Sequence, residues 1–268
     1  MSAKMPLAAL WSCAGFCVAA LALVAAGLGI NGWNDFLWVL QAPAPVGIWL
    51  ALEASAVVLA IALPAVALLG FAAAGAAIDA KIGGFLAKFT EPAADSRIAT
   101  ASVVVGTVIL IVVVSAGYRP DILSASLALI VVNLPAITGR FARALRAVSV
   151  VRLQAAAATG AGPVHIFFFV LARAAAKGLV AAVLTTAAQM LGETAALAVA
   201  SRAALGGSHL KASTLGAWPL AVDLWTRASA HADLSAVSAA TLILTLIILL
   251  LRSVAHALTP RAANPKPT

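Results

Sequence analysis

Long uncharged apolar stretches constrain the fold of this chain more than any other feature. Residues 98–117 contain no charged side chain, and residues 46–78 contain only Glu53. The chain of 268 residues is 63% hydrophobic and only 10% charged. A soluble domain carries about 25% charged residues. A core in water cannot hide this much apolar surface, so we expect lipid to surround most of the chain.

The length of these stretches favours helices over a β-barrel. A helix needs about 20 apolar residues to cross the hydrocarbon region, whereas barrel strands are about ten residues long and alternate in polarity. We therefore predict an all-α integral membrane protein with six transmembrane helices. The expected spans are residues 6–30, one within 46–78, 98–117, 122–139, one within 174–201, and 234–258.

The ends of the chain are expected to differ from the central part. Residues 6–30 are apolar for longer than the core of a cleavable signal peptide, so we expect this first helix to be retained. Together with an external connection it makes up residues 1–45. Residues 46–258 would form the membrane core, and residues 259–268, which are rich in proline, a loose cytoplasmic tail.

The placement of Lys and Arg predicts the orientation of the spans. With the amino terminus inside, 13 of the 17 basic residues fall on the cytoplasmic side, as is usual for membrane proteins. Both termini are then cytoplasmic. The net charge of +8 therefore indicates topology, and no nucleic-acid partner is expected. The four basic residues on the outer side are Arg119, Arg202, Lys211 and Arg227.

The chain lacks the groups that would let it act as an enzyme by itself. We find no nucleophile–base constellation, no Gly-rich phosphate loop before a Lys, and no spacing typical of metal ligands. We therefore expect no cofactor and no metal. Energy has to come from a gradient or from a partner, and the basic cytoplasmic loop at about 140–173 is the natural docking place. Topology and contact with anionic lipid are the simpler interpretations of its basic cluster, residues 140–152.

A short motif in this loop has a specific pattern. Gln154, Ala155 and Ala156 are followed by three residues and then Gly160. Small residues allow a short helix to turn sharply at Gly160, and the apolar run Ile166–Leu171 can lie along the membrane face.

The pattern resembles the coupling loop of ABC-transporter permeases of the type I importer kind. The consensus of that family is Glu-Ala-Ala-x3-Gly, followed by Ile-x-Leu-Pro. Gln154 replaces the usual acid, and Ala172-Arg173 stands where the family has Leu-Pro.

A second motif points to one branch of that family. Residues 192–197 read Gly-Glu-Thr-Ala-Ala-Leu and resemble the Gly-Glu-Thr-Ala-Pro-Leu signature of phosphate-specific permeases, closest to the PstA type. The resemblance covers about residues 46–258. In those permeases an Arg usually stands four residues before the Glu, where this chain has Gln189. A fixed positive charge for the anion is thus missing there. A partner subunit could supply it, the chain could carry another oxyanion, or it could be a diverged copy.

Glu193 is the most unusual residue of the fifth expected span. A charge inside a bilayer costs at least about 2.5–3.5 kcal/mol and commonly marks a pathway. Thr185, Gln189 and Glu193 recur every four residues and so share one face of a helix. With Thr194 they are predicted to line a translocation pathway, in which Glu193 would pair with a cation. The alternative is that they are hydrogen-bonding contacts between helices.

The resemblance implies one of two permease subunits of an ATP-driven importer in a bacterial plasma (inner) membrane, with inorganic phosphate as the first choice of substrate. Cytoplasmic ABC ATPase subunits would grip the coupling loop, and a periplasmic substrate-binding protein would deliver the anion. The second permease subunit would be a homologue or a second copy. Two alternatives stay open: a permease for molybdate, tungstate or sulfate, and a non-transporting membrane scaffold or sensor.

Overall fold

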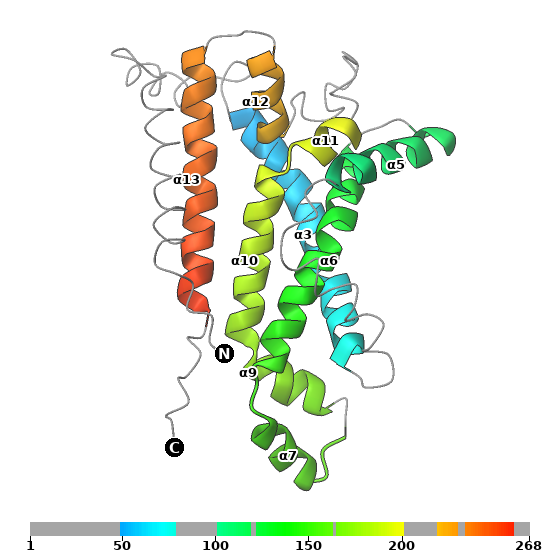
Figure 1. The fold of residues 1–268 in the computed structure, drawn as a ribbon, viewed down its shortest axis with the longest axis vertical. Coiled ribbons are helices and arrows are strands. Elements are labelled where there is room, and N and C mark those ends of the chain that lie inside the picture. Colours follow the sequence, from blue (N-terminus) through cyan, green and yellow to red (C-terminus); the bar gives the residue numbers. More distant parts are fainter. Residues whose placement is uncertain are drawn as a thin grey trace.

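The structure is a computed structural model that describes residues 49–78, 101–118, 122–162, 165–200, 219–229 and 234–259. Every regular element in these ranges is a helix (Figure 1). The expected first helix and most of the tail lie outside the described residues. The helices are α3 (Trp49–Ile78), α5 (Ala101–Ser115), α6 (Ile122–Arg146), α7 (Val150–Ala158), the π-helix η1 (Ile166–Leu171), α9 (Ala172–Ala174), α10 (Ala176–Gly192), α11 (Ala195–Ala200), α12 (Leu220–Ser229) and α13 (Leu234–Leu258).

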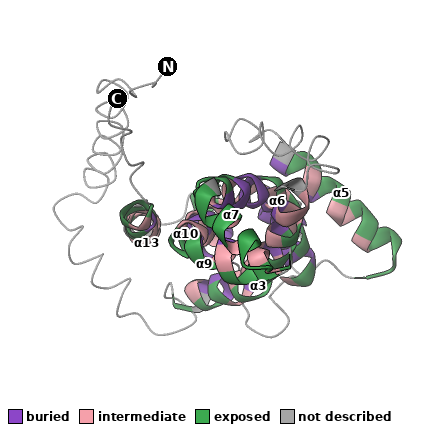
Figure 2. Ribbon diagram, turned by 90° about the horizontal axis from the view of Figure 1, so that it is seen from below, coloured by how far each residue is buried: buried purple, intermediate pink, exposed green. Residues whose placement is uncertain are grey.

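Three of the described helices, α3, α6 and α13, are long and apolar enough to cross a membrane. A fourth candidate is a bent pair, in which Ile166–Ala174 meets α10 at 70°. The described residues are therefore all-α with three or four candidate membrane spans, and the number of six spans is not confirmed. α5 has 15 residues, fewer than the roughly 20 that a span needs. It projects sideways from the bundle in both views (Figures 1 and 2).

α3 and α6 form the core of the bundle because one face of α3 is made of small side chains. Gly70 allows the closest approach, since a Cβ added there would lie only 2.6 Å from Ile137 Cγ2 of α6. Small residues at a helix contact increase the area over which the two backbones can pack. The buried residues on this face recur every fourth position: Ala54, Val58, Ala62, Val66, Gly70 and Ala74.

The outer surface of the bundle is strongly apolar. Leu68 of α3 is 73% exposed, Ile111 of α5 is 58% exposed and Leu250 of α13 is 66% exposed. Figure 2 shows buried residues gathered where helices face one another and exposed residues around the outside. Contiguous apolar surface of this kind is unfavourable in water and is expected where a helix faces lipid.

α11 packs against both α5 and α6. A Cβ added at Gly106 of α5 would lie 2.9 Å from the Ala196 carbonyl oxygen, so the two backbones are almost in contact. The Ser124 hydroxyl of α6 donates a hydrogen bond of 3.1 Å to the Ala200 carbonyl oxygen. The contact is therefore made of backbone and small side chains.

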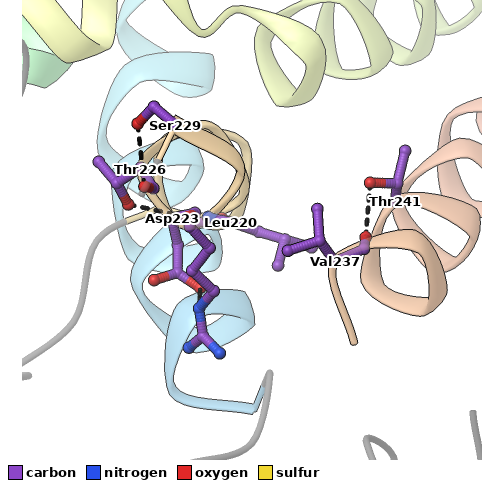
Figure 3. A network of polar contacts seen from close by, with 8 residues as sticks. Leu220, Asp223, Thr226, Ser229, Val237 and Thr241 are labelled. Carbon is purple, nitrogen blue, oxygen red and sulfur yellow. Dashed lines mark hydrogen bonds and ion pairs between the residues drawn. The ribbon is translucent and has the colours of Figure 1, made fainter. Parts of the chain in front are cut away.

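α12 joins the first turns of α3 to those of α13. The Leu220 N–H donates a buried hydrogen bond of 2.7 Å to Ser55 Oγ of α3, and the Leu220 side chain packs in one cluster with Val237 of α13. The polar contacts of α12 otherwise stay within the helix, where Arg227 pairs with Asp223 at 2.8 Å and the Thr226 hydroxyl donates to the Asp223 carbonyl (Figure 3). The contacts of α12 therefore hold the first turns of α3 and α13 together.

Candidate functional site

One charged side chain bridges α6 and α10. Arg140 Nη1 donates a hydrogen bond of 2.8 Å to Thr186 Oγ1, and Arg140 Nη2 donates one of 2.7 Å to Gln189 Oε1. Thr186 is fully buried, whereas Arg140 and Gln189 are half-buried. We call this set of three residues the Arg140 bridge. It joins two helices that are candidate spans or part of one.

The local sequence explains the geometry of the Arg140 bridge. Thr186 and Gln189 are three residues apart and therefore lie on the same face of α10. α6 continues to Arg146, past residue 139, which the apolar pattern predicted as the end of the span. Arg140 is consequently part of the helix rather than the first residue of the loop. A guanidinium among apolar helices needs polar partners, and α10 supplies two.

The Arg140 bridge corrects the expectation that a fixed positive charge is missing beside Gln189. The charge is present, at 2.7 Å from the Gln189 side chain, but it comes from α6. One signal in the sequence indicates that Arg140 lies on a polar face of α6, but not which residues of α10 it contacts. Ser126, Asn133 and Arg140 recur at intervals of seven residues, which returns to the same face of a helix.

Asn133 is a second polar group on that face of α6. Its Nδ2 donates a hydrogen bond of 3.0 Å to the Leu129 carbonyl oxygen. Its Oδ1 is fully buried and has no partner among the residues that the structure describes. An unsatisfied buried acceptor of this kind costs about 1–3 kcal/mol. α6 therefore carries both a cation and an acceptor that lacks a donor.

Glu193 and Thr194 lie at a break between two helices. α10 ends at Gly192, and Glu193 has an extended backbone with φ −79° and ψ 100°. α11 begins directly after Thr194. The spacing predicted that Glu193 would continue the helical row of Thr185 and Gln189. This prediction is wrong, because the helix ends before Glu193. Within the described ranges no ion pair joins Glu193 to another residue, so its pairing with a cation stays a prediction.

The predicted coupling-loop residues lie on α7 and in the turn that follows it. Gln154 and Ala155 are exposed and Ala156 is half-buried. Gly160 has a φ of +78°, which is the left-handed conformation that glycine adopts without strain after a helix end. A sharp turn at Gly160 is therefore present, as the sequence indicated.

Aromatic rings fasten η1 to the rest of the bundle. The centroid of Phe71 of α3 lies 5.3 Å from that of Phe167 of η1 and 6.1 Å from that of Phe141 of α6. Phe167 is half-buried against the core, whereas Phe168 and Phe169 are 56% and 62% exposed. The apolar run therefore packs on Phe71 of α3 through Phe167 and Phe168, and its more exposed side is of the kind expected against lipid.

A cleft of about 660 Å³ lies next to the Arg140 bridge. Residues of α6, α7 and α10 line it, and Thr185 and Arg140 belong to its wall. Two of the predicted pathway residues, Thr185 and Gln189, are thus close to Arg140, while Glu193 and Thr194 lie further along the chain at the end of α10.

No model of a known protein family matches the chain, and no curated protein matches it.

Proposed function

We propose that the chain is one of two membrane subunits of an ATP-driven importer of oxyanions, with inorganic phosphate as its substrate. The observation that carries the proposal is the Arg140 bridge, a cation shared between two helices of a membrane-spanning bundle. Ionisable groups in such positions commonly mark the route of an ion or substrate, because their burial is costly. The proposal also draws on the resemblance of residues 154–160 and 192–197 to type I importer permeases.

The chemistry of the guanidinium suits a tetrahedral oxyanion. Arg has five N–H donors in a planar fork, of which the bridge uses two. Charge-assisted hydrogen bonds to an anion are about twice as strong as bonds to neutral acceptors. An arriving oxyanion would therefore compete with Thr186 and Gln189 for the same donors. The exchange would release α10 from α6 when the anion binds.

Coupling to a partner would use the segment from α7 to η1. The exposed turn at Gly160 offers a projection to cytoplasmic ATPase subunits, which would supply the hydrolysis of ATP. Phe167 and Phe71 connect this segment to α3, so a movement of the loop would reach the bundle through packed rings. A periplasmic binding protein and a second permease subunit, either a homologue or a second copy, would complete the importer in a bacterial plasma membrane.

Uptake of radiolabelled phosphate tests the proposal directly. A host strain without other phosphate uptake systems would carry the intact gene or a deletion of it. We expect the deletion to abolish uptake and the intact gene to restore it. Co-purification of an ATPase subunit, lost in a variant in which Gly160 is replaced by Pro, would support the coupling role. Unchanged uptake in the deletion strain would overturn the assignment.

The same assay separates the alternatives for the substrate. An Arg fork binds any tetrahedral oxyanion, so molybdate, tungstate and sulfate are each added as unlabelled competitors. If one of these anions inhibits uptake at a lower concentration than unlabelled phosphate does, that anion is assigned as the substrate in place of phosphate. A chain that binds no ATPase subunit and transports none of these anions would instead be a membrane scaffold or sensor.

A further inference from the structure

The cleft beside the Arg140 bridge contains a concentration of positive charge. Arg143 of α6, Arg152 of α7 and Lys177 of α10 line it together with Arg140. No acidic residue is among the described residues of its wall, and the ion pair between Arg227 and Asp223 lies elsewhere, in α12. Like charges in one cleft repel one another unless an anion offsets them.

Apart from Ser149, Thr185 and Thr259, the remaining wall of the cleft is apolar and built mainly from small residues. α6 and α10 come close at its floor, where a Cβ added at Gly178 would lie 3.0 Å from the Ala144 Cβ. Ala147, Ala181 and Ala182 continue this surface. Pockets of 300–1,000 Å³ accommodate organic molecules, so about 660 Å³ is far more than a bare oxyanion needs.

We propose that this cleft is a binding site for a negatively charged phosphate group, supplied by the headgroup of an anionic phospholipid. Arg143, Arg152 and Lys177 would hold the phosphate, and an acyl chain would lie along the alanine wall. Basic pockets between helices near the cytoplasmic surface are known to suit such headgroups. The shared chemistry is the phosphate group, and free inorganic phosphate is the other source that the test distinguishes.

The position of the three cations gives the ligand a structural consequence. They come from three helices, and one of them is α7, the exposed helix before the Gly160 turn. A phosphate bound between Arg152 and Lys177 would tie α7 to α10. The occupied cleft would therefore fix the orientation of α7, and this holds whether or not the chain transports an anion.

Two pairs of substitutions with equal loss of charge test the site. Arg152→Gln/Lys177→Gln removes two cations from the cleft wall, whereas Arg146→Gln/Arg173→Gln removes two exposed cations that do not line it. The purified full chain is placed in phosphatidylcholine nanodiscs with increasing phosphatidylglycerol, and bound lipid is measured by native mass spectrometry. Thermal unfolding of each variant confirms that the protein is folded.

Each basic residue near an anionic lipid contributes about fivefold to binding. The cleft variant lacks two of them, so we expect phosphatidylglycerol to bind it about 30-fold more weakly. The control variant should change it by less than about threefold, because exposed charges outside a site contribute little. Equal weakening by the two variants, or no weakening by either, would overturn the proposal.

A second variant keeps every charge and separates the two sources of phosphate. Ala147→Trp fills the apolar part of the cleft, and Ala157→Trp on the exposed face of α7 is its control. Radiolabelled inorganic phosphate is titrated in nanodiscs of phosphatidylcholine alone. Loss of phosphatidylglycerol binding in Ala147→Trp alone supports the lipid source. Phosphate binding that depends on Arg152 and Lys177, without selectivity for phosphatidylglycerol, would overturn the lipid source and assign the site to the free anion.

Discussion

The two faces of α6 differ in their polar contacts, although α10 also packs closely on α6 where Gly178 meets Ala144. Toward α3 the contact is apolar and tight, with Gly70 against Ile137. Toward α10 a cation is held by two side chains, Thr186 and Gln189. Close apolar packing has one arrangement that fits, whereas hydrogen bonds of a guanidinium can be exchanged for others. Under the proposed transport role, α3 and α6 would move as one body and α10 would be the helix that changes partners.

The largest effect on stability is expected from a substitution that disrupts the tight contact between α3 and α6. Gly70→Ala places a methyl group 2.6 Å from Ile137 Cγ2, and overpacking of this kind typically costs about 1–3 kcal/mol. We expect a lower thermal unfolding temperature in detergent. Gly192→Ala is the matched control, since its Cβ would meet Ile248 Cδ1 at an ordinary 3.5 Å.

A compensating change sharpens the same test. Ile137→Leu moves the branch from Cβ to Cγ and removes the methyl group that Gly70→Ala would strike. The double variant should recover part of the lost stability, because the two side chains are in contact. Equal stability of Gly70→Ala and the Gly192→Ala control would show that this face is not tightly packed.

A smaller effect is expected at the turn after α7. Gly160 and Gly117 have nearly the same positive φ, +78° and +79°, and a Cβ at either would meet no atom within 4 Å. Replacement by Ala therefore costs about 1 kcal/mol of local strain at both positions. Only Gly160 lies in the proposed coupling loop. Gly160→Ala should reduce uptake while Gly117→Ala does not, and an equal effect of the two would count against coupling through this turn.

The smallest effect is expected from removing one acceptor of the bridge. Thr186→Val keeps the shape of the side chain and removes one hydrogen bond to Arg140, which in membrane bundles is worth about 0.6 kcal/mol. Gln189 still holds the guanidinium, so we expect little change in thermal unfolding. A loss as large as that of Gly70→Ala would mean that the two faces of α6 do not differ in the way described.

The sequence predicted the helical elements better than their contacts. Long uncharged runs indicated α3, α6 and α13, and the spacing of small residues indicated the turn at Gly160, because both depend on local chain properties. The partners of Arg140 depend on how α6 and α10 align, which no local pattern specifies. The break at Glu193 was also missed, because the surrounding residues favour a continuous helix.

In the proposed function the cation between α6 and α10 binds the transported anion, and an exchange of its position between the two helices tests that role. Phosphate uptake is measured for Arg140→Gln, Gln189→Arg and the double exchange at equal membrane levels. A hydrogen bond to a charged group contributes about 1.5–3 kcal/mol, so we expect Arg140→Gln to reduce uptake at least about tenfold. The double exchange places the cation on α10 instead of α6, and it should restore much of the lost uptake. Uptake by Arg140→Gln at the rate of the unaltered protein would contradict a role of Arg140 in binding the anion.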